Sequence, residues 1–249
     1  MIKILKSIFI ILAILTGCPG GKAMSAIDYS LDFSDPTVRE LVKAITAGDT
    51  NTVKRLANEG VNLNAVGEYE NTPLRVAVKL KRKQIVRLLF ELGVSPNLRT
   101  PKGTVAAADD AVIEKDLDFL GLFLQFKLDP NLYCHDVPLI FFAVSESNWP
   151  HYEMLLAKGA DINSKAANGR TLLLELVMQM EYDRAKELML RGADFRPVSE
   201  HGLNVLDELV DYQRRLCNAP NLPDCRKRAE ILGLIKERGG TVPAGLPYM

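Results

Sequence analysis

Apolar residues recur at helical spacing, with polar residues between them, in pairs of short segments along most of the chain. One pair covers residues 74–80 and 84–91. In its second segment, Ile85, Leu88 and Leu89 fall on one face of a helix. Segments of this length and pattern predict two short amphipathic helices joined by a turn. Because similar pairs follow one another along the chain, the pattern predicts an all-α protein.

A short motif closes each pair and recurs at a nearly constant interval. Its glycine position is occupied by Gly60, Gly93, Lys127, Gly159 and Gly192, with spacings of 33, 34, 32 and 33 residues. A second landmark keeps step with the first and begins at Thr72, Thr104, Val137, Thr171 and Asn204. A unit of this size cannot bury its apolar face alone, so the repetition predicts a solenoid of stacked units with one shared core.

Particular residues in each unit suit the ends of helices. Thr72 precedes Pro73, and a threonine hydroxyl can cap a helix whose first turn accommodates proline. Gly60 and its equivalents suit the left-handed residue that follows the end of a helix. These residues therefore predict where each helix pair begins and where it ends.

The two landmarks resemble those of the ankyrin repeat, whose units combine a Thr-Pro-Leu-His start, two helices and a Gly-Ala-Asp-x-Asn end. The resemblance implies an ankyrin-repeat solenoid of about six helix-turn-helix units with short hairpin-like turns over residues 35–240. The implied units are about 35–67, 68–100, 101–134, 135–166, 167–199 and 200–240, and the first and last read as caps. Arg75 stands where the family has histidine, Lys127 replaces a glycine, and differences in length fall at 107–116 and 142–152. Residues 241–249 should form an irregular tail.

The first residues resemble the export signal of a bacterial lipoprotein. Lys3 and Lys6 precede an apolar run, 8–15, that is too short to span a bilayer as a helix. The sequence Leu15-Thr16-Gly17-Cys18 is similar to the lipobox, in which the cysteine is acylated and becomes the new N-terminus. We therefore expect a signal peptide at 1–17 and lipidation of Cys18. An ordinary cleaved signal and an uncleaved anchor are the alternatives.

Acylation would hold the mature protein on a bacterial membrane, facing the periplasm. Residues 18–34 would then contain the lipidated cysteine and a tether to the first unit. The choice between inner and outer membrane stays open, because Pro19 is not the common outer-membrane residue after the cysteine.

Two further cysteines, Cys217 and Cys225, lie in a segment rich in turn-forming residues. Export would place them where disulfides persist, so we expect a bond between them that stabilises the fold by roughly 2–3 kcal/mol. The alternative is a pair of metal ligands, but no histidine lies nearby to complete a zinc site. Cys134 has no evident partner and is expected to be an unreactive thiol.

Composition and charge narrow the kinds of partner. Of 249 residues, 47% are hydrophobic and 25% are charged, which is typical of a globular protein. The formal net charge is zero, so a nucleic-acid partner, which would require a clustered basic excess, is not expected. The densest basic run, 79–83, is either a solvated face or a patch for an acidic partner or anionic lipid headgroups.

No catalytic residues, metal site or cofactor are predicted. His135, His151 and His201 lie in different units without the spacing of metal ligands, and His135 and His201 fall at turns where side chains are usually exposed. Asp109 and Asp110 are adjacent, which should place them on different helix faces and argues against a carboxylate dyad.

The ankyrin resemblance implies that a partner binds along a concave surface formed by turn tips and first helices. Tyrosine and arginine contribute strongly to protein interfaces. The candidate contacts are Tyr69, Arg75, Arg99, Tyr133, His135 and Arg170. Trp149 is expected to pack between helices.

These features predict a membrane-tethered periplasmic module that binds another protein and catalyses no reaction. By analogy of fold and location, the sharpest version is an immunity protein that neutralises a secreted antibacterial toxin such as a phospholipase effector. A chaperone or scaffold for a periplasmic enzyme fits the same observations. An intracellular interaction protein, or an enzyme with an unrecognised site, would be the alternatives from other classes.

Overall fold

The structure, a computed structural model, describes residues 27–103, 107–217 and 223–247. Its elements are η2 (Tyr29–Asp32), α2 (Pro36–Ala47), α3 (Thr50–Asn58), α4 (Pro73–Lys79), α5 (Lys83–Glu91), α6 (Ala108–Ile113), α7 (Leu117–Gln125), β1 (Tyr133–Cys134), β2 (Val137–Pro138), α8 (Leu139–Ser145), α9 (Trp149–Ala157), α10 (Leu172–Met178), α11 (Tyr182–Leu190), α12 (Val205–Leu216) and α13 (Pro223–Glu237). The signal peptide and Cys18 predicted from the sequence lie outside the described residues.

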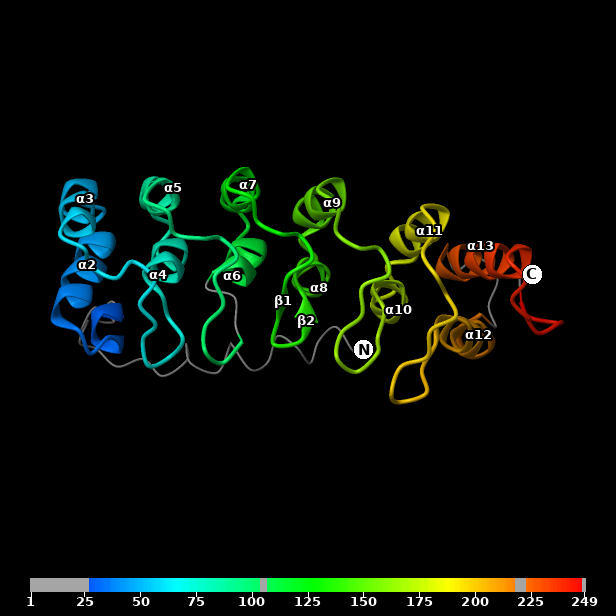
Figure 1. Cartoon of the computed structure of the whole chain (residues 1–249). Coiled ribbons are helices and arrows are strands. Elements are labelled where there is room, and N and C mark those ends of the chain that lie inside the picture. The colour runs from blue at the N-terminus through cyan, green and yellow to red at the C-terminus, as the bar shows by residue number, and fades with distance from the viewer. Residues whose placement is uncertain (1–26, 104–106, 218–222, 248–249) are drawn as a thin grey trace, which may run out of the picture.

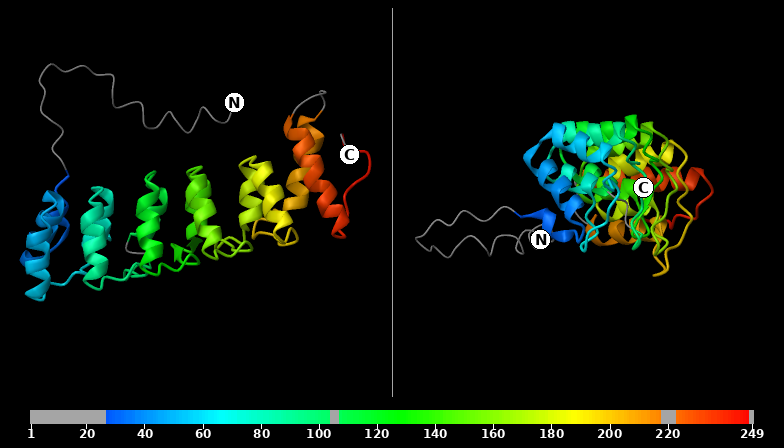
Figure 2. Two further views of the ribbon diagram at one scale, coloured as in Figure 1. Left: turned by 90° about the horizontal axis from the view of Figure 1, so that it is seen from above. Right: turned by 60° about the vertical axis from the view of Figure 1, so that its left-hand side comes forward.

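The helices form two rows, and each antiparallel pair stacks on the next (Figure 1). The inner row contains the even-numbered helices α2 to α12, and the odd-numbered helices α3 to α13 form the outer row. Neighbouring units contact one another helix to helix within each row, and the view from above shows the pairs side by side (Figure 2). The stacked helix pairs predicted from the sequence period are therefore present. The described residues also contain the short antiparallel pair β1–β2 and an isolated antiparallel bridge between Lys165 and Thr171.

One hydrophobic core runs through the whole stack. Leu41, Leu74, Phe119 and Leu139 are members of this core, and each is almost completely buried. Complete burial of such a side chain stabilises a fold by about 1.5–3 kcal/mol. Stability is therefore distributed along the solenoid, with each unit covering the apolar surface of its neighbours.

Helix ends follow the chemistry predicted from the sequence. The Thr72 hydroxyl accepts a hydrogen bond from the Arg75 amide at 3.1 Å, and Thr171 caps α10 in the same way. Gly60 follows α3 with φ of 85°, in the left-handed region that ends a helix. Lys127 occupies the equivalent position with φ of 68°, so the departure from glycine leaves the backbone geometry unchanged.

Asparagine side chains set the spacing between consecutive units. Asn97 Oδ1 accepts from the Asp129 amide at 2.8 Å, and Asn131 Oδ1 accepts from the Asp161 amide at 2.7 Å. One unit later, Asn163 Oδ1 accepts from the Asp194 amide at 2.8 Å. The same bond thus fixes the register of several adjacent units.

Both ends of the solenoid are closed by additional structure. The tether expected at 18–34 is folded from Tyr29 onward, because η2 packs against α2. Asp32 also joins this segment to the second unit, where its carbonyl accepts from the Glu68 amide at 2.8 Å. At the other end, α12 and α13 pack together and are joined by a disulfide. Residues 241–247 beyond them contain no helix or strand.

Candidate protein-binding surface

A row of hairpin tips projects from the inner helices along one side of the molecule (Figure 1). The tips comprise residues 65–71, 99–103, 133–138, 165–171 and 197–204. We call these tips, together with the exposed side of the inner helices, the hairpin face.

Backbone hydrogen bonds join several of the tips to one another. The Ala167 amide donates to the Asp136 carbonyl at 3.0 Å, and the Glu200 amide donates to the Asn168 carbonyl at 2.9 Å. At the N-terminal end, the bond from Glu68 to Asp32 links the second unit to η2. Because backbone groups make these bonds, the tips are held in fixed relative positions whatever side chains they carry.

The β1–β2 tip turns on only two residues. His135 and Asp136 have φ of 48° and 59°, the pair of positive values typical of a type I′ hairpin turn. Histidine and aspartate tolerate this conformation better than most residues with a Cβ atom. The turn therefore holds the exposed imidazole of His135 at the far end of the hairpin.

Most of the partner contacts predicted from the sequence lie on these tips. Tyr69 is 72% exposed, and Arg99 and His135 are also exposed. Tyr133 and Arg170 are half-buried. These five side chains therefore lie on the tips at 65–71, 99–103, 133–138 and 165–171.

Arg75, the sixth predicted contact, is placed differently. It lies on α4 with only 7% of its surface exposed. Its guanidinium bonds Asp109 through Nη2 and Asp110 through Nε, both at 2.5 Å, across the junction between the second and third units. The prediction of an exposed contact was wrong because these two carboxylates hold the side chain inside the stack.

The same cluster corrects the expectation for the two aspartates. Adjacent positions on a helix normally face different directions, yet both side chains of α6 reach the single guanidinium of Arg75. Burial raises the pKa of the Asp110 carboxyl, while the positive charge of Arg75 opposes that shift. The pair forms an internal ion cluster and leaves neither carboxylate as a separate acid or base.

A hollow of about 400 Å³ opens between the fourth and fifth units on the hairpin face. Its apolar wall includes Phe141 and Phe142, and its polar side contains Arg170 and Glu175. Glu175 Oε2 lies 3.2 Å from Arg170 Nη2. Arg170 Nε has no hydrogen-bond partner among the described residues. An apolar pocket with unused polar capacity suits a partner side chain that has both characters.

Glu175 was not among the residues predicted from the sequence. It lies on α10, one turn after Thr171, at a position where the pattern of the helix gives no sign of function. Its importance becomes visible only when the fourth and fifth units are stacked, because the hollow is formed by residues of both.

The basic run 79–83 makes contacts within the protein. Lys81 Nζ lies 2.9 Å from Glu114, and Lys83 Nζ lies 2.7 Å from Asp118. Arg82 donates to the Thr46 carbonyl at 2.7 Å. These bonds connect neighbouring units and neutralise much of the positive charge, so they favour the interpretation as a solvated face over that of a patch for an acidic partner.

The three histidines have different surroundings. His135 and His201 are exposed, as expected for turn residues. His151 is completely buried, and neither of its ring nitrogens has a hydrogen-bond partner among the described residues. Burial lowers the pKa of the His151 imidazole. In the part of the chain that the structure describes, no group of His, Cys, Asp and Glu residues is arranged to hold a metal ion.

Trp149 packs between helices, as predicted. The Arg184 guanidinium lies 3.8 Å from the centre of its ring, and Tyr152 contacts the ring edge-on. Trp149 therefore links α9 to α11 and is not part of the hairpin face.

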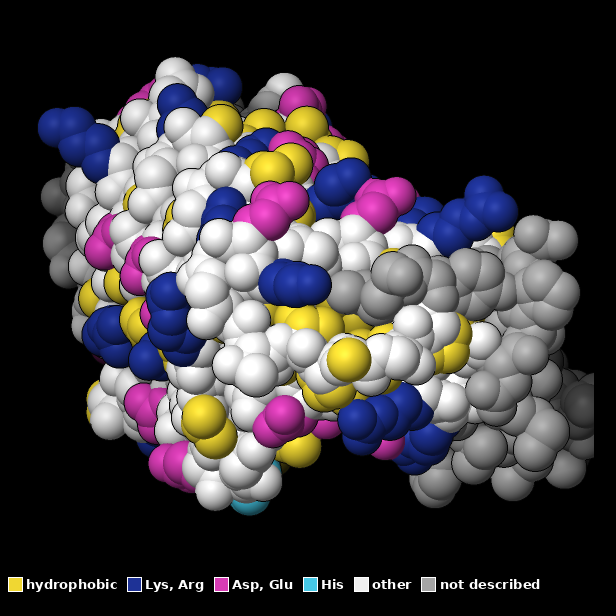
Figure 3. Space-filling model, turned by 90° about the vertical axis from the view of Figure 1, so that its right-hand side faces the viewer, with side chains coloured by type: hydrophobic (Ala, Val, Ile, Leu, Met, Phe, Trp, Pro, Cys, Tyr) yellow, Lys and Arg dark blue, Asp and Glu magenta, His cyan; other side chains and the backbone are white. Residues whose placement is uncertain are grey.

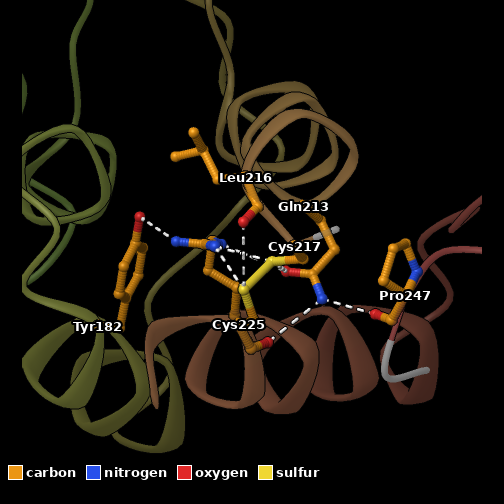
Figure 4. Close-up of a disulfide and its surroundings, with 7 residues drawn as sticks. Tyr182, Gln213, Leu216, Cys217, Cys225 and Pro247 are labelled. Atoms are coloured by element: carbon orange, nitrogen blue, oxygen red, sulfur yellow. Dashed lines mark hydrogen bonds between the residues drawn. A yellow bond between two sulfur atoms is a disulfide. The ribbon is translucent and has the colours of Figure 1, made fainter. Parts of the chain in front are cut away.

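The disulfide predicted between Cys217 and Cys225 is present and joins α12 to α13 (Figure 4). Seen from this end, the surface shows basic and acidic side chains interspersed around apolar ones (Figure 3).

Cys134 is buried, with its sulfur 3.5 Å from an Asp109 carboxylate oxygen. Across residues 27–103, 107–217 and 223–247, no helix is long and apolar enough to cross a membrane.

Comparison with known proteins identifies the repeats. Residues 28–100 match the family model "Ankyrin repeats (3 copies)". A putative ankyrin repeat protein of fowlpox virus is 31% identical over 153 residues, covering 56% of this chain and 35% of the viral protein. The rabbit (Oryctolagus cuniculus) "Ankyrin repeat, SAM and basic leucine zipper domain-containing protein 1" is 30% identical over 106 residues, covering 41% of this chain and 22% of that protein. The chain thus spans about a fifth to a third of the length of these curated relatives.

A solved structure shows the same fold. The ankyrin repeat domain of Bcl-3, described as a member of the IkappaB protein family, superposes with a TM-score of 0.64 at 24% sequence identity. The match covers 81% of this chain and 86% of the Bcl-3 chain. The described part of the chain therefore has the fold of stacked ankyrin repeats.

Proposed function

We propose that this chain, which has the ankyrin-repeat fold, binds another protein across its hairpin face. The observation that carries the proposal is the row of tips, several of them joined by backbone hydrogen bonds, from which Tyr69, Arg99 and His135 project. A surface that is already ordered loses little conformational entropy on binding, so more of the contact energy contributes to affinity.

The hollow between the fourth and fifth units is the proposed anchor point. Side chains that bury into a pocket near the centre of an interface usually contribute most of the binding energy. Phe141 and Phe142 offer apolar contact, while Arg170 and Glu175 offer polar partners at the edge of the same hollow. The exposed side chains of the other tips would surround this anchor.

We further propose that the protein is tethered to a bacterial membrane through a lipid on Cys18 and faces the periplasm. The support is the basic, apolar and lipobox sequence of residues 1–18. Replacing Cys18 with serine should release the protein from membranes or leave the unprocessed precursor. Normal processing and membrane attachment of the Cys18→Ser variant would disprove lipidation.

The proposed partner is a secreted antibacterial toxin, which makes the protein an immunity protein. A tether in the periplasm would place the hairpin face where an incoming toxin such as a phospholipase effector acts, before it reaches its substrate. This step rests on the analogy of fold and location.

Cell survival separates the immunity role from its alternatives. The protein is co-expressed with periplasm-directed antibacterial lipase effectors, as the wild type, as Tyr69→Ala with Arg99→Ala, and as the outer-surface control Lys54→Ala. We expect the wild type and the control to protect the cells and the hairpin-face variant to fail to protect them. If no effector is neutralised and crosslinks from the hairpin face lead instead to a resident periplasmic enzyme, the protein is a chaperone or scaffold.

A further inference from the structure

A buried arginine, Arg228, contacts both sulfur atoms of the disulfide between Cys217 and Cys225, which Figure 4 shows. Arg228 Nη2 is 2.9 Å from the sulfur of Cys217 and 3.2 Å from the sulfur of Cys225. Arg228 is on α13, one helical turn after Cys225, and only 2% of its surface is exposed. A full positive charge is therefore held at the disulfide, away from solvent.

The other partners of this guanidinium are neutral. Arg228 Nη1 donates to the Tyr182 hydroxyl at 3.1 Å, and Nε donates to Gln213 Oε1 at 3.2 Å. Burial raises the pKa of the Tyr182 hydroxyl, so this group stays protonated at neutral pH. Among the described residues, no carboxylate forms an ion pair with Arg228. A buried charge without a counterion is costly, and the oxidised cysteines supply none.

The orientation of Gln213 keeps this environment fixed. Its Nε2 donates to the Cys225 carbonyl at 3.2 Å and to the Pro247 carbonyl at 2.6 Å, which directs Oε1 towards Arg228. Gln213 is itself completely buried. The guanidinium is thus positioned by neighbours on α11 and α12, and its closeness to the sulfurs follows from that placement.

Reduction of the disulfide would provide the missing anion. A thiolate next to Arg228 would form a buried ion pair, and Cys225 is also in the first turn of α13, where the helix dipole favours negative charge. Both effects stabilise the reduced form relative to the disulfide. A disulfide whose reduced form is stabilised is a stronger oxidant than an ordinary structural one.

We propose that Cys217 and Cys225 form a thiol–disulfide exchange site for dithiols, in which Arg228 stabilises the leaving thiolate of Cys225. A thiolate of the dithiol attacks the Cys217 sulfur, the bond between the two cysteine sulfurs breaks, and its electrons leave on Cys225. The second thiol of the dithiol loses its proton and attacks the mixed disulfide. The dithiol is oxidised to a disulfide, and the Cys217 sulfur takes up a proton. This site is separate from the hairpin face and does not depend on the proposed binding function.

Both cysteines are almost completely buried, so exchange requires a local opening between α12 and α13. This opening governs the rate, whereas Arg228 governs the equilibrium between the two redox states. The test is therefore made at equilibrium, in the folded full-length protein.

The experiment equilibrates the protein with mixtures of reduced and oxidised dithiothreitol and measures the state of each cysteine by alkylation and peptide mass spectrometry. The pKa of each thiol in the reduced protein is measured from the pH dependence of alkylation. Arg228→Met should raise the pKa of Cys225 by about one unit and shift the equilibrium about tenfold towards the disulfide. Arg226→Met, an exposed position on the same helix, is the matched control and should behave as the wild type.

Gln213→Glu provides a second test that retains the arginine. The new carboxylate would neutralise Arg228 in the oxidised protein, so it should also raise the pKa of Cys225 and favour the disulfide. If Arg228→Met does not fold, this variant decides the question. Thiol pKa values and redox equilibria that equal those of Arg226→Met in every variant that folds would overturn the proposal.

Discussion

Arg75 on α4 bonds Asp109 on α6 with both carboxylate oxygens within 2.6 Å of its Nη2, although the two residues are 34 positions apart. That separation is one repeat, so the two residues occupy neighbouring units of the stack. Arg75 occupies a position that would face solvent in a single unit, but in the stack it forms part of the junction between two units.

The first prediction concerns this junction. Arg75→Ala leaves the two carboxylates of Asp109 and Asp110 without their counterion, so we expect it to lower the free energy of unfolding by about 3–5 kcal/mol. Urea denaturation measures the change. Arg87→Ala on the exposed surface of α5 is the control and should alter stability by less than about 0.5 kcal/mol. Equal stability of the two variants would show that the ion cluster does not hold the units together.

The second prediction concerns binding at the hairpin face. Tyr133→Ala combined with Arg99→Ala should weaken partner binding by at least about tenfold, or about 1.4 kcal/mol, because a partner that spans several tips contacts both. Titration calorimetry with the identified partner measures the affinity. Both residues lie on tips outside the core, so the melting temperature should change little. A core change, Leu89→Ala, should instead lower stability by about 2–5 kcal/mol. An unchanged affinity in the double variant would place the binding site elsewhere.

The third prediction is a pH dependence of stability that arises from His151. Burial lowers the pKa of this histidine in the folded protein below its ordinary value of 6.5, although Asp116 and Glu114 oppose the shift. The unfolded chain therefore takes up a proton more readily than the folded protein. His151 does not reduce the free energy of unfolding above about pH 6.5, and it lowers this free energy as the pH falls below that value. Denaturation at pH 7.5 and pH 5.5 should show this loss in the wild type. His151→Leu should lose less stability over this range than the wild type, whereas the exposed-site variant His201→Ala should retain the full loss.

The fourth prediction compares two glycines. A Cβ atom on Gly67 would lie 2.9 Å from the Asp32 carbonyl oxygen, so Gly67→Ala should push η2 away from the second unit and lower stability by about 1–3 kcal/mol. A Cβ on Gly121, within α7, would meet nothing within 4 Å. Gly121→Ala should therefore raise stability by about 0.5–1 kcal/mol, because alanine favours a helix more than glycine does. Thermal unfolding measures both, and a stable Gly67→Ala variant would mean that the contact with Asp32 is readily rearranged.

The helix pairs were predictable because their information is local. Periodic apolar positions, the cap at Thr72 and the left-handed glycines each specify structure within a few residues of themselves. Lys127 replaces the glycine at one helix end without changing the predicted structure. The other landmarks of its unit fix the backbone, and the lysine adopts the left-handed conformation. The disulfide was predictable for a similar reason, since both cysteines lie close together in sequence.

Contacts between units were the part that the sequence analysis missed. The burial of Arg75 and the hollow around Glu175 depend on residues about one repeat away, and Arg228 bonds Tyr182, which is 46 positions away. The spacing between Arg75 and Asp109 did contain a signal, because opposite charges one period apart occupy neighbouring places in stacked units. No comparable signal marked Arg228, whose neutral partners could not be distinguished from ordinary core residues.

The asparagine bonds between units have a mechanical consequence. The side chains of Asn97, Asn131 and Asn163 each bond to the next unit, so tension applied along the stack would load these junctions in series. A chain under such a pull should lengthen one unit at a time, starting at its weakest end. The disulfide closes the C-terminal pair covalently, whereas among the described residues η2 is held by hydrogen bonds, packing and the contact of Lys79 with the Tyr29 ring. The protein should therefore unravel from the end nearest its proposed lipid anchor.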